Sequence, residues 1–172
     1  RGGAVSNLLI GGVDPVPAGN ENLTSSPSAT YQCADAPLNI AANKQEQWEA
    51  LATHLRVPHL MRDPRFLTRY DRRVHRRDLN ALLEEVLRQK PAAQWEDELN
   101  ALGVPAGRVL SVKDALQDPH YVARNQIGAY TLPDGRTIRS VRTGVQIDGA
   151  PLTVDTAPPS LGAHTDAVLA DL

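Results

Sequence analysis

Residues 31–41, YQCADAPLNIA, predict the strand pair on which the fold is built. Tyr31–Ala34 and Leu38–Ala41 are short stretches suited to strands, and Asp35-Ala36-Pro37 between them is typical of a turn. The preceding residues 13–30 are rich in Pro, Gly, Asn and Ser, a composition that cannot hold a helix. We therefore expect an irregular loop, with accessible backbone amides, that leads into the strand pair.

A helix is predicted directly after the second strand. Asn43 is a good N-cap, and Glu46 three residues later completes a capping-box pattern. Trp48, Leu51 and Leu55 follow at helical spacing, so one face of this helix is expected to pack inward.

Two further helices are predicted between residues 79 and 103. The first is amphipathic, and its apolar positions are Leu79, Leu82, Leu83, Val86 and Leu87. Pro91 suits the first turn of the second, where a missing N–H costs nothing. The second helix is expected to end at Gly103, a natural left-handed C-cap. Its expected buried residues are Trp95, Leu99 and Leu102.

The pattern changes after Gly103. Ser111 and Asp114 form another capping-box pattern, which predicts a brief helix through Leu116. We expect His120 to shape a turn after Asp118-Pro119, and His164 to help start the last helix. The other elements expected are an extended passage at 104–110, strands within Ile127 to Val154 with a hairpin at Pro133-Asp134-Gly135, and a closing helix at Asp166 to Leu172.

Composition narrows the class of protein. The 172 residues are 41% hydrophobic and 22% charged, which is ordinary globular usage and suits one α+β domain or a small domain with an extension. The formal charge of −2 gives no argument for binding nucleic acid or an anionic membrane, and no apolar run is long enough to span a bilayer. Cys33 is the single cysteine, so an intrachain disulfide is excluded and a reducing, cytoplasmic location is the simplest expectation.

None of the individual polar residues predicts a catalytic centre. The five histidines lack metal-ligand spacing, and His54 and His75 are expected to be solvated on helices. Cys33 is expected to be a small buried side chain rather than a nucleophile. Glu84 and Glu85 are adjacent on a helix, so they point apart and do not form an acid–base pair. The arginine run Arg69–Arg77 predicts a solvated helix start laced with ion pairs.

The beginning of the sequence predicts a fragment. Arg1-Gly2-Gly3 resembles neither a signal peptide nor a helix start, and Leu8–Gly12 resembles the tail of an element that began upstream. An artificial boundary or unobserved N-terminal residues are the alternatives. We expect the residues present not to perform the parent protein's chemistry alone.

The order of short motifs along the chain is more specific than any one of them. The series is Ala18-Gly19-Asn20, Tyr31 to Asp35, Leu38-Asn39-Ile40-Ala41, Gln47-Trp48, Asp63-Pro64-Arg65-Phe66, Arg72-Arg73, Gly103 to Val109, Asp118-Pro119-His120, Ala157 to Thr165 and Val168-Leu169. This series resembles the C-terminal half of the class III CoA-transferase family, which includes formyl-CoA and carnitine-CoA transferases and the α-methylacyl-CoA racemases. The resemblance covers almost the whole chain.

The resemblance implies a fold that composition could not show. Family members have a Rossmann-like large domain built from both chain ends, with a small α+β domain inserted between, and two subunits interlock as a homodimer. Residues 1–12 would end the linker from an N-terminal half, 13–110 would form the small α+β domain, and 111–172 would return to the large domain. Strands and apolar faces after about residue 110 would then lack partners within this chain.

The resemblance also implies a reaction. The family's transferases move CoA from an acyl-CoA to a carboxylic acid through an aspartate nucleophile, an aspartyl-CoA thioester being an intermediate. That aspartate is expected upstream, and no residue of this sequence takes a catalytic role. Coenzyme A enters as a thioester substrate, and no metal is implied. An acyl-CoA racemase of the same family and a non-catalytic binding or scaffold module are the alternatives.

One active-site element is implied for this chain. In formyl-CoA transferase, a glycine-rich loop that closes over the reacting aspartate follows a Gly-Asn pair that corresponds to Gly19-Asn20. Here the loop lacks glycine, and Asp35-Ala36 stands where relatives usually have Asp-Gly. A plain surface loop is the alternative. The implied substrate-binding residues are Gly19, Asn20, Asn22, Leu23, Thr24, Ser25 and Ser26.

Overall fold

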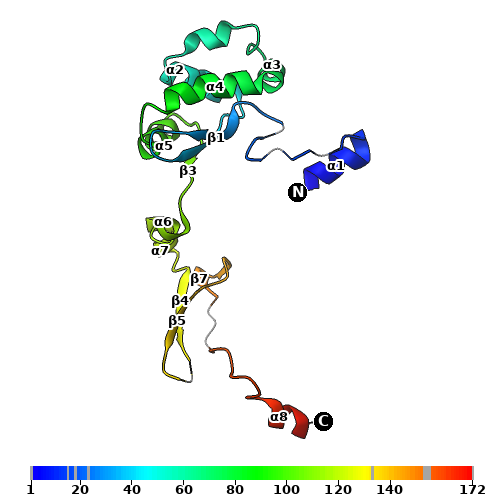
Figure 1. The fold of residues 1–172 in the computed structure, drawn as a ribbon, viewed down its shortest axis with the longest axis vertical. Helices are drawn as coiled ribbons and strands as arrows, with labels where there is room; N and C mark the ends of the chain where they lie inside the picture. Colours follow the sequence, from blue (N-terminus) through cyan, green and yellow to red (C-terminus); the bar gives the residue numbers. More distant parts are fainter. Residues whose placement is uncertain are drawn as a thin grey trace. The chain divides into compact units, whose positions relative to one another are not determined.

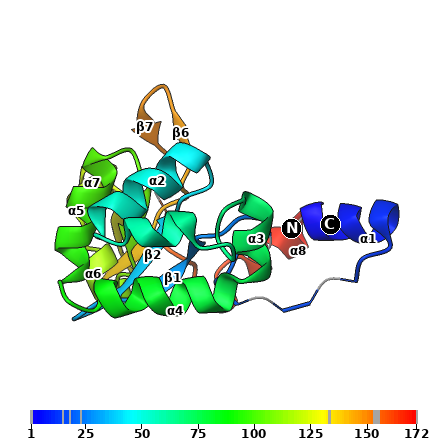
Figure 2. The same ribbon diagram turned by 90° about the horizontal axis from the view of Figure 1, so that it is seen from above.

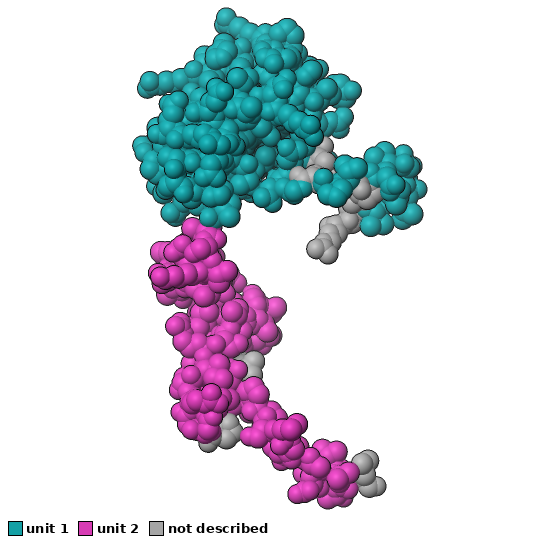
Figure 3. Space-filling model, in the orientation of Figure 1, with its two compact units in different colours: residues 1–109 teal, residues 110–172 magenta. Residues whose placement is uncertain are grey.

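The computed structural model describes residues 2–14, 16–17, 19–22, 24–132, 134–152 and 156–171. The chain divides into two compact units, residues 1–109 and residues 110–172 (Figure 3). Each unit has its own strands and helices, which are labelled along the chain in Figure 1. The expectation of a mixed α+β fold is confirmed.

The first unit combines an antiparallel sheet with helices. Its elements are α1 (Gly2–Gly11), β1 (Ser28–Gln32), β2 (Pro37–Ala41), α2 (Gln45–His54), the 3₁₀ helix η1 (Pro58–Arg62), α3 (Arg69–Val74), α4 (Arg76–Leu87), α5 (Ala92–Ala101) and β3 (Ala106–Arg108).

The sheet of the first unit has the order β1-β2-β3. Tyr31 pairs with Leu38 across β1 and β2, and Ile40 pairs with Ala106 across β2 and β3. The predicted first strand is displaced, since β1 begins at Ser28 rather than Tyr31 and ends at Gln32 rather than Ala34. Small residues before Tyr31 have a loop-like composition, but pairing with β2 draws them into the sheet.

Helices cover this sheet with their apolar faces. α4 lies along β1 (Figure 1 and Figure 2), and α5 contacts β2 and β3. Leu79, Leu83 and Leu87 are fully buried at a spacing of four, as the pattern predicts. The Trp95 indole N–H donates to the Leu87 carbonyl oxygen at 2.8 Å, which joins α5 to the end of α4.

At the end of α5, the residue that is buried differs from the one predicted. α5 ends at Ala101, and Gly103 has the left-handed φ of +74° that was expected of it. Leu102, predicted to be buried, is 47% exposed because the chain has already turned there. Val104 is fully buried in the same core instead.

Two helix starts differ from the sequence prediction. α2 begins at Gln45, and the Gln47 side-chain oxygen accepts from the Lys44 N–H at 3.0 Å, so the capping box lies one residue later than predicted. Asn43 instead accepts a hydrogen bond from the Ser28 hydroxyl at 2.8 Å. α1 begins at Gly2, although Arg1-Gly2-Gly3 was not expected to start a helix. The first N–H groups of any helix have no partner within the helix, so residues without a capping pattern can occupy this turn.

The second unit is made of short elements. They are α6 (Val112–Ala115), α7 (Pro119–Ala123), β4 (Ile127–Thr131), β5 (Thr137–Val141), β6 (Gln146–Ile147), β7 (Ala150–Pro151) and α8 (Thr165–Ala170). β4 pairs with β5 and β6 with β7, both antiparallel. Among the described residues of this unit, Gln126 alone is buried.

Local capping organises the second unit. The Ser111 hydroxyl accepts from the Asp114 N–H at 3.1 Å, which confirms the predicted start of α6. Asp118 accepts from the backbone N–H groups of His120 and Tyr121, so this stretch is the short helix α7 rather than the predicted turn. His164 directly precedes α8 but makes no side-chain cap bond.

The predicted hairpin is present as β4 and β5, with Tyr130 opposite Ile138 and a positive φ at Gly135. Three residues named in these predictions lie outside the described residues: Pro133 of the hairpin turn, Val154 at the end of the predicted strand region, and Leu172 at the end of the predicted closing helix. In the part of the chain that is described, no helix has the length and apolar character needed to cross a membrane. The described His, Cys, Asp and Glu side chains form no group of three or more suited to a metal ion.

Candidate functional site

The loop that precedes β1 carries the implied substrate-binding residues. Gly19 has a left-handed φ of +57°. The Asn22 side-chain oxygen accepts from both the N–H and the hydroxyl of Thr24 at 2.9 Å, and the Asn22 N–H donates to the Ser28 carbonyl at 3.0 Å. The loop is therefore folded upon itself before it enters the sheet. Leu23 lies outside the described residues.

Asn20 shares a cavity with residues of β1 and α4. The cavity has a volume of about 380 Å³, and Tyr31, Asn80 and Glu84 also line it. The Tyr31 hydroxyl donates to the Asn80 side-chain oxygen at 2.8 Å, and burial raises the pKa of this phenol. Glu84 accepts from the Gln32 N–H, so its carboxylate supports the end of β1.

Arginines from α3 and α4 anchor the loop. Arg69 donates to the Thr24 carbonyl at 3.4 Å, and Arg72 donates through Nε to the Ser26 carbonyl at 3.2 Å. Arg76 forms an ion pair with Glu21 at 3.4 Å. Sequence reasoning missed this role. The i,i+3 spacing of Arg69 and Arg72 within α3 was a signal that these two lie on one helical face, whereas Arg76 is the first residue of the next helix, α4.

The prediction of a solvated arginine run is wrong at Arg72, which is only 2% exposed, whereas Arg69, Arg73 and Arg77 are exposed as predicted. Its Nη1 donates to the Phe66 and Leu67 carbonyls at 3.1 and 3.4 Å, and its Nη2 donates to the Gln45 side-chain oxygen at 2.9 Å. The guanidinium lies 5.4 Å from the centre of the Trp48 ring. Burial lowers the pKa of Arg72 from its very high ordinary value.

The hydroxyls of Ser25 and Ser26 are buried in this loop conformation. Both lack a hydrogen-bond partner among the described residues. An unsatisfied buried polar group costs about 1–3 kcal/mol. The structure thus holds two neighbouring hydroxyl donors that a change in the loop, or an incoming polar group, would satisfy.

A separate cluster surrounds Glu98 on α5. Lys90 Nζ donates to this carboxylate at 2.7 Å, and His54 Nε2 lies 2.7 Å from it. The Lys90 bond, followed by the His54 bond, lowers the pKa of Glu98 to about 2. His54 also contacts the Trp95 ring edge-on, so it is a half-buried partner rather than the solvated residue that was predicted.

Cys33 and His75, the other residues considered as site candidates, have positions that the fold explains. Cys33 is buried, as predicted, and burial together with Asp35 and Glu84 raises its thiol pKa to about 11. A neutral buried thiol is a poor nucleophile. His75 joins the end of α3 to the start of α4.

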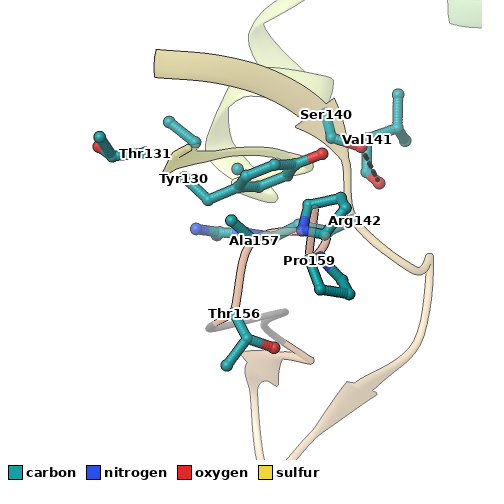
Figure 4. Close-up of a pocket in the computed structure, with 11 residues that line it drawn as sticks. Tyr130, Thr131, Ser140, Val141, Arg142, Thr156, Ala157 and Pro159 are labelled. Carbon is teal, nitrogen blue, oxygen red and sulfur yellow. Dashed lines mark hydrogen bonds between the residues drawn. The ribbon is translucent and has the colours of Figure 1, made fainter. Parts of the chain in front are cut away.

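A larger cavity of about 610 Å³ lies in the second unit (Figure 4). Tyr130 of β4, Arg142 after β5, and Ala157 are placed around it. Arg142 donates to the Asn125 carbonyl at 3.0 Å. The lining residues are Gly128, Ala129, Tyr130, Thr131, Ser140, Val141, Arg142, Thr156, Ala157, Pro158 and Pro159, and they include no carboxylate or histidine.

The described site is a small α+β unit with an anchored polar loop. Residues 3–165 match the model of CoA-transferase family III, and the chain belongs to that family. The family membership expected from the motif order is therefore confirmed.

The sequence is similar to several curated CoA-transferases. It is 33% identical over 148 residues to the succinyl-CoA–D-citramalate CoA-transferase of Chloroflexus aurantiacus, a match that covers 86% of this chain and 37% of that protein. It is 31% identical over 168 residues to the succinate–glutarate CoA-transferase of Agrobacterium fabrum, covering 96% of this chain and 42% of that protein.

The structure resembles that of a CAIB/BAIF family protein from Brucella suis. The TM-score is 0.79 at 32% sequence identity, and the match covers 98% of this chain and 43% of that chain. The chain thus spans less than half the length of each of these relatives.

Proposed function

We propose that this chain is part of an acyl-CoA:carboxylate CoA-transferase. The observation that carries the proposal is the family match over residues 3–165, together with curated transferases that are more than 30% identical. The names of these relatives specify succinyl-CoA, citramalate, succinate and glutarate, so a carboxylic acid and its CoA thioester are the proposed substrate class.

The proposed reaction proceeds through an aspartate carboxylate. The carboxylate attacks the acyl-CoA carbonyl and expels the CoA thiolate, which leaves a mixed anhydride. The thiolate then attacks the aspartyl carbonyl, releases the first acid and forms an aspartyl-CoA thioester. The acceptor carboxylate attacks this thioester and expels CoA, which finally attacks the acceptor's acyl carbonyl and restores the aspartate.

We place this aspartate outside the present sequence, in the length of the relatives that the chain does not cover. The chain alone is therefore expected not to exchange CoA. The proposal also assigns the parts of the chain: residues 1–12 end a linker, residues 13–110 form the small domain, and residues 111–172 return to a large domain. An interlocked homodimer, a cytoplasmic location and a reaction without a metal also belong to it.

The loop at residues 19–26 is the proposed contact of this chain with the acyl group. Gly19, Asn20, Asn22, Leu23, Thr24, Ser25 and Ser26 are the proposed substrate-binding residues. The polar character of the loop supports this role, as do the Ser25 and Ser26 hydroxyls without partners. Neutral N–H and O–H donors suit the carbonyl and carboxylate oxygens that appear during the exchange.

The test uses the full-length protein encoded by the gene. Purified protein is incubated with succinyl-CoA and ¹⁸O-labelled glutarate, and the products are followed by mass spectrometry. We expect glutaryl-CoA to form and ¹⁸O to pass into succinate through the enzyme carboxylate. Borohydride is expected to trap the thioester by reducing one aspartate. Absence of transfer with a panel of mono- and dicarboxylic acids would refute the proposal.

The same preparation separates the other functions. Loss of α-deuterium from a labelled 2-methylacyl-CoA without acyl exchange would instead indicate a racemase. Absence of both reactions and of acyl-CoA binding would indicate a non-catalytic module. A Ser25→Ala, Ser26→Ala double variant is expected to lower kcat/KM for the acyl-CoA, with unchanged affinity for free CoA.

A further inference from the structure

We infer that Arg72 is the positioning residue that fixes the loop at residues 22–26 in its place. The consequence of this role for catalysis rests on the proposed function, since that function puts an acyl group beside the loop. The placement of the loop itself rests on the contacts of Arg72 alone.

Arg72 connects segments that are far apart in the sequence. Its Nε binds the Ser26 carbonyl, its Nη1 binds the carbonyls of Phe66 and Leu67, and its Nη2 binds Gln45 at the start of α2. One planar group thus joins the loop, the segment before α3, and α2. The Trp48 ring beneath the guanidinium restricts its rotation.

The charge of Arg72 is buried without an ion pair. None of the ion pairs between described residues includes it. A buried cation is costly unless its donors are satisfied, so neutral carbonyl and amide oxygens must do this here. If the loop moved, Arg72 Nε would lose its acceptor, and if the guanidinium were removed, the Ser26 carbonyl would lose this donor.

The other two anchors of the loop are weaker. Arg69 reaches the Thr24 carbonyl at the limit of a hydrogen bond and in an exposed place. The ion pair between Arg76 and Glu21 is 3.4 Å long, and Glu21 is exposed. The Arg76 side chain is itself only 14% exposed, but a long contact to an exposed partner contributes little because water competes for that partner. Of the three arginine contacts to the loop, the bond to Ser26 is the buried one, and it acts together with the bond from the Asn22 N–H to the Ser28 carbonyl of β1.

A lysine cannot replace this arrangement. An ammonium group concentrates its donors on one atom, whereas the guanidinium distributes them over a rigid fork. Arg72→Lys keeps the charge and loses the fork, and Arg72→Met keeps the apolar stem alone. Arg73→Met is the matched control, because Arg73 is the next residue of the same helix, is exposed, and lies 5.2 Å over Tyr70.

The experiment compares these variants with wild type in the full-length protein, by amide hydrogen exchange and by CoA-exchange kinetics. In Arg72→Lys and Arg72→Met we expect exchange in residues 22–28 to accelerate about tenfold or more, while exchange in α4 and α5 stays at the wild-type rate. We expect kcat/KM for the acyl-CoA to fall about 10- to 100-fold, because misplacing a positioning group has effects of this size. The dissociation constant for free CoA should change less than about twofold, and Arg73→Met should resemble wild type in every measurement.

Each result is decisive. A merely structural role would raise exchange throughout the unit or leave the kinetics of the folded enzyme unchanged, and either result would overturn the inference. So would slow exchange in residues 22–28 of both Arg72 variants. If wild type itself transfers no CoA, the proposed function fails, and the exchange data alone then decide whether Arg72 fixes the loop.

Discussion

The contact of Glu98 with Lys90 and His54 leads to a quantitative prediction for Glu98→Gln. The carboxylate is 26% exposed, and its pKa is lowered from an ordinary 4.5 to about 2, chiefly by Lys90. A lowering of this size is equivalent to about 3 kcal/mol if water does not screen the interaction. Because Lys90 and His54 are also about a third exposed, we expect about 1–2 kcal/mol to remain.

The sign of the pH dependence follows from the direction of the shift. A carboxyl group with a lowered pKa in the folded state stabilises the fold above its unfolded value of 4.5, and this stability is lost as the pH falls toward about 2. Glu98→Gln should therefore be less stable than wild type at pH 7 by about 1–2 kcal/mol. The two proteins should become equally stable near pH 2.

Urea unfolding of the chain, followed by tryptophan fluorescence, is the assay. The two tryptophans, Trp48 and Trp95, are both buried in the first unit and report on it. Other carboxylates with lowered pKa values, such as Asp63 and Asp71, are present in both proteins and cancel in the difference. A difference that stays constant from pH 7 to pH 2, or no difference at pH 7, would refute the reasoning.

The remaining predictions concern packing, backbone conformation and reactivity. Leu83→Ala should lower the free energy of unfolding by about 2–5 kcal/mol in urea titrations, and the half-buried Leu82→Ala by clearly less; equal losses would contradict the burial of α4. Gly103→Ala should cost about 1–2 kcal/mol because φ is +74° there, whereas Gly107→Ala, with ordinary φ and open space around it, should change stability by less than about 1 kcal/mol, as thermal melts would show. Cys33 should react with iodoacetamide at pH 8 at least about tenfold more slowly in the folded chain than in urea, because burial raises its pKa to about 11; equal rates would show that the thiol is accessible.

Local sequence patterns were sufficient for much of the fold. The apolar face of α4, the left-handed Gly103, the cap at Ser111 and the β4–β5 hairpin were all predicted and are present. Each depends on residues within a few positions of one another, so neighbours in the sequence determine it. The order of motifs also indicated the family, which no single residue could.

The candidate site depended on tertiary contacts. Arg72 belongs to a run of arginines whose composition indicates solvent exposure, yet it is buried because its acceptors are 46 and 27 residues away at Ser26 and Gln45. Asn43 was displaced as a helix cap by its contact with Ser28, which is 15 residues away. A side chain that satisfies distant backbone groups leaves no periodic signal in its own neighbourhood. The sequence by itself therefore determined those helices and turns that local patterns encode, together with the family of this protein, whereas only the packed structure decided which arginine is buried against the loop.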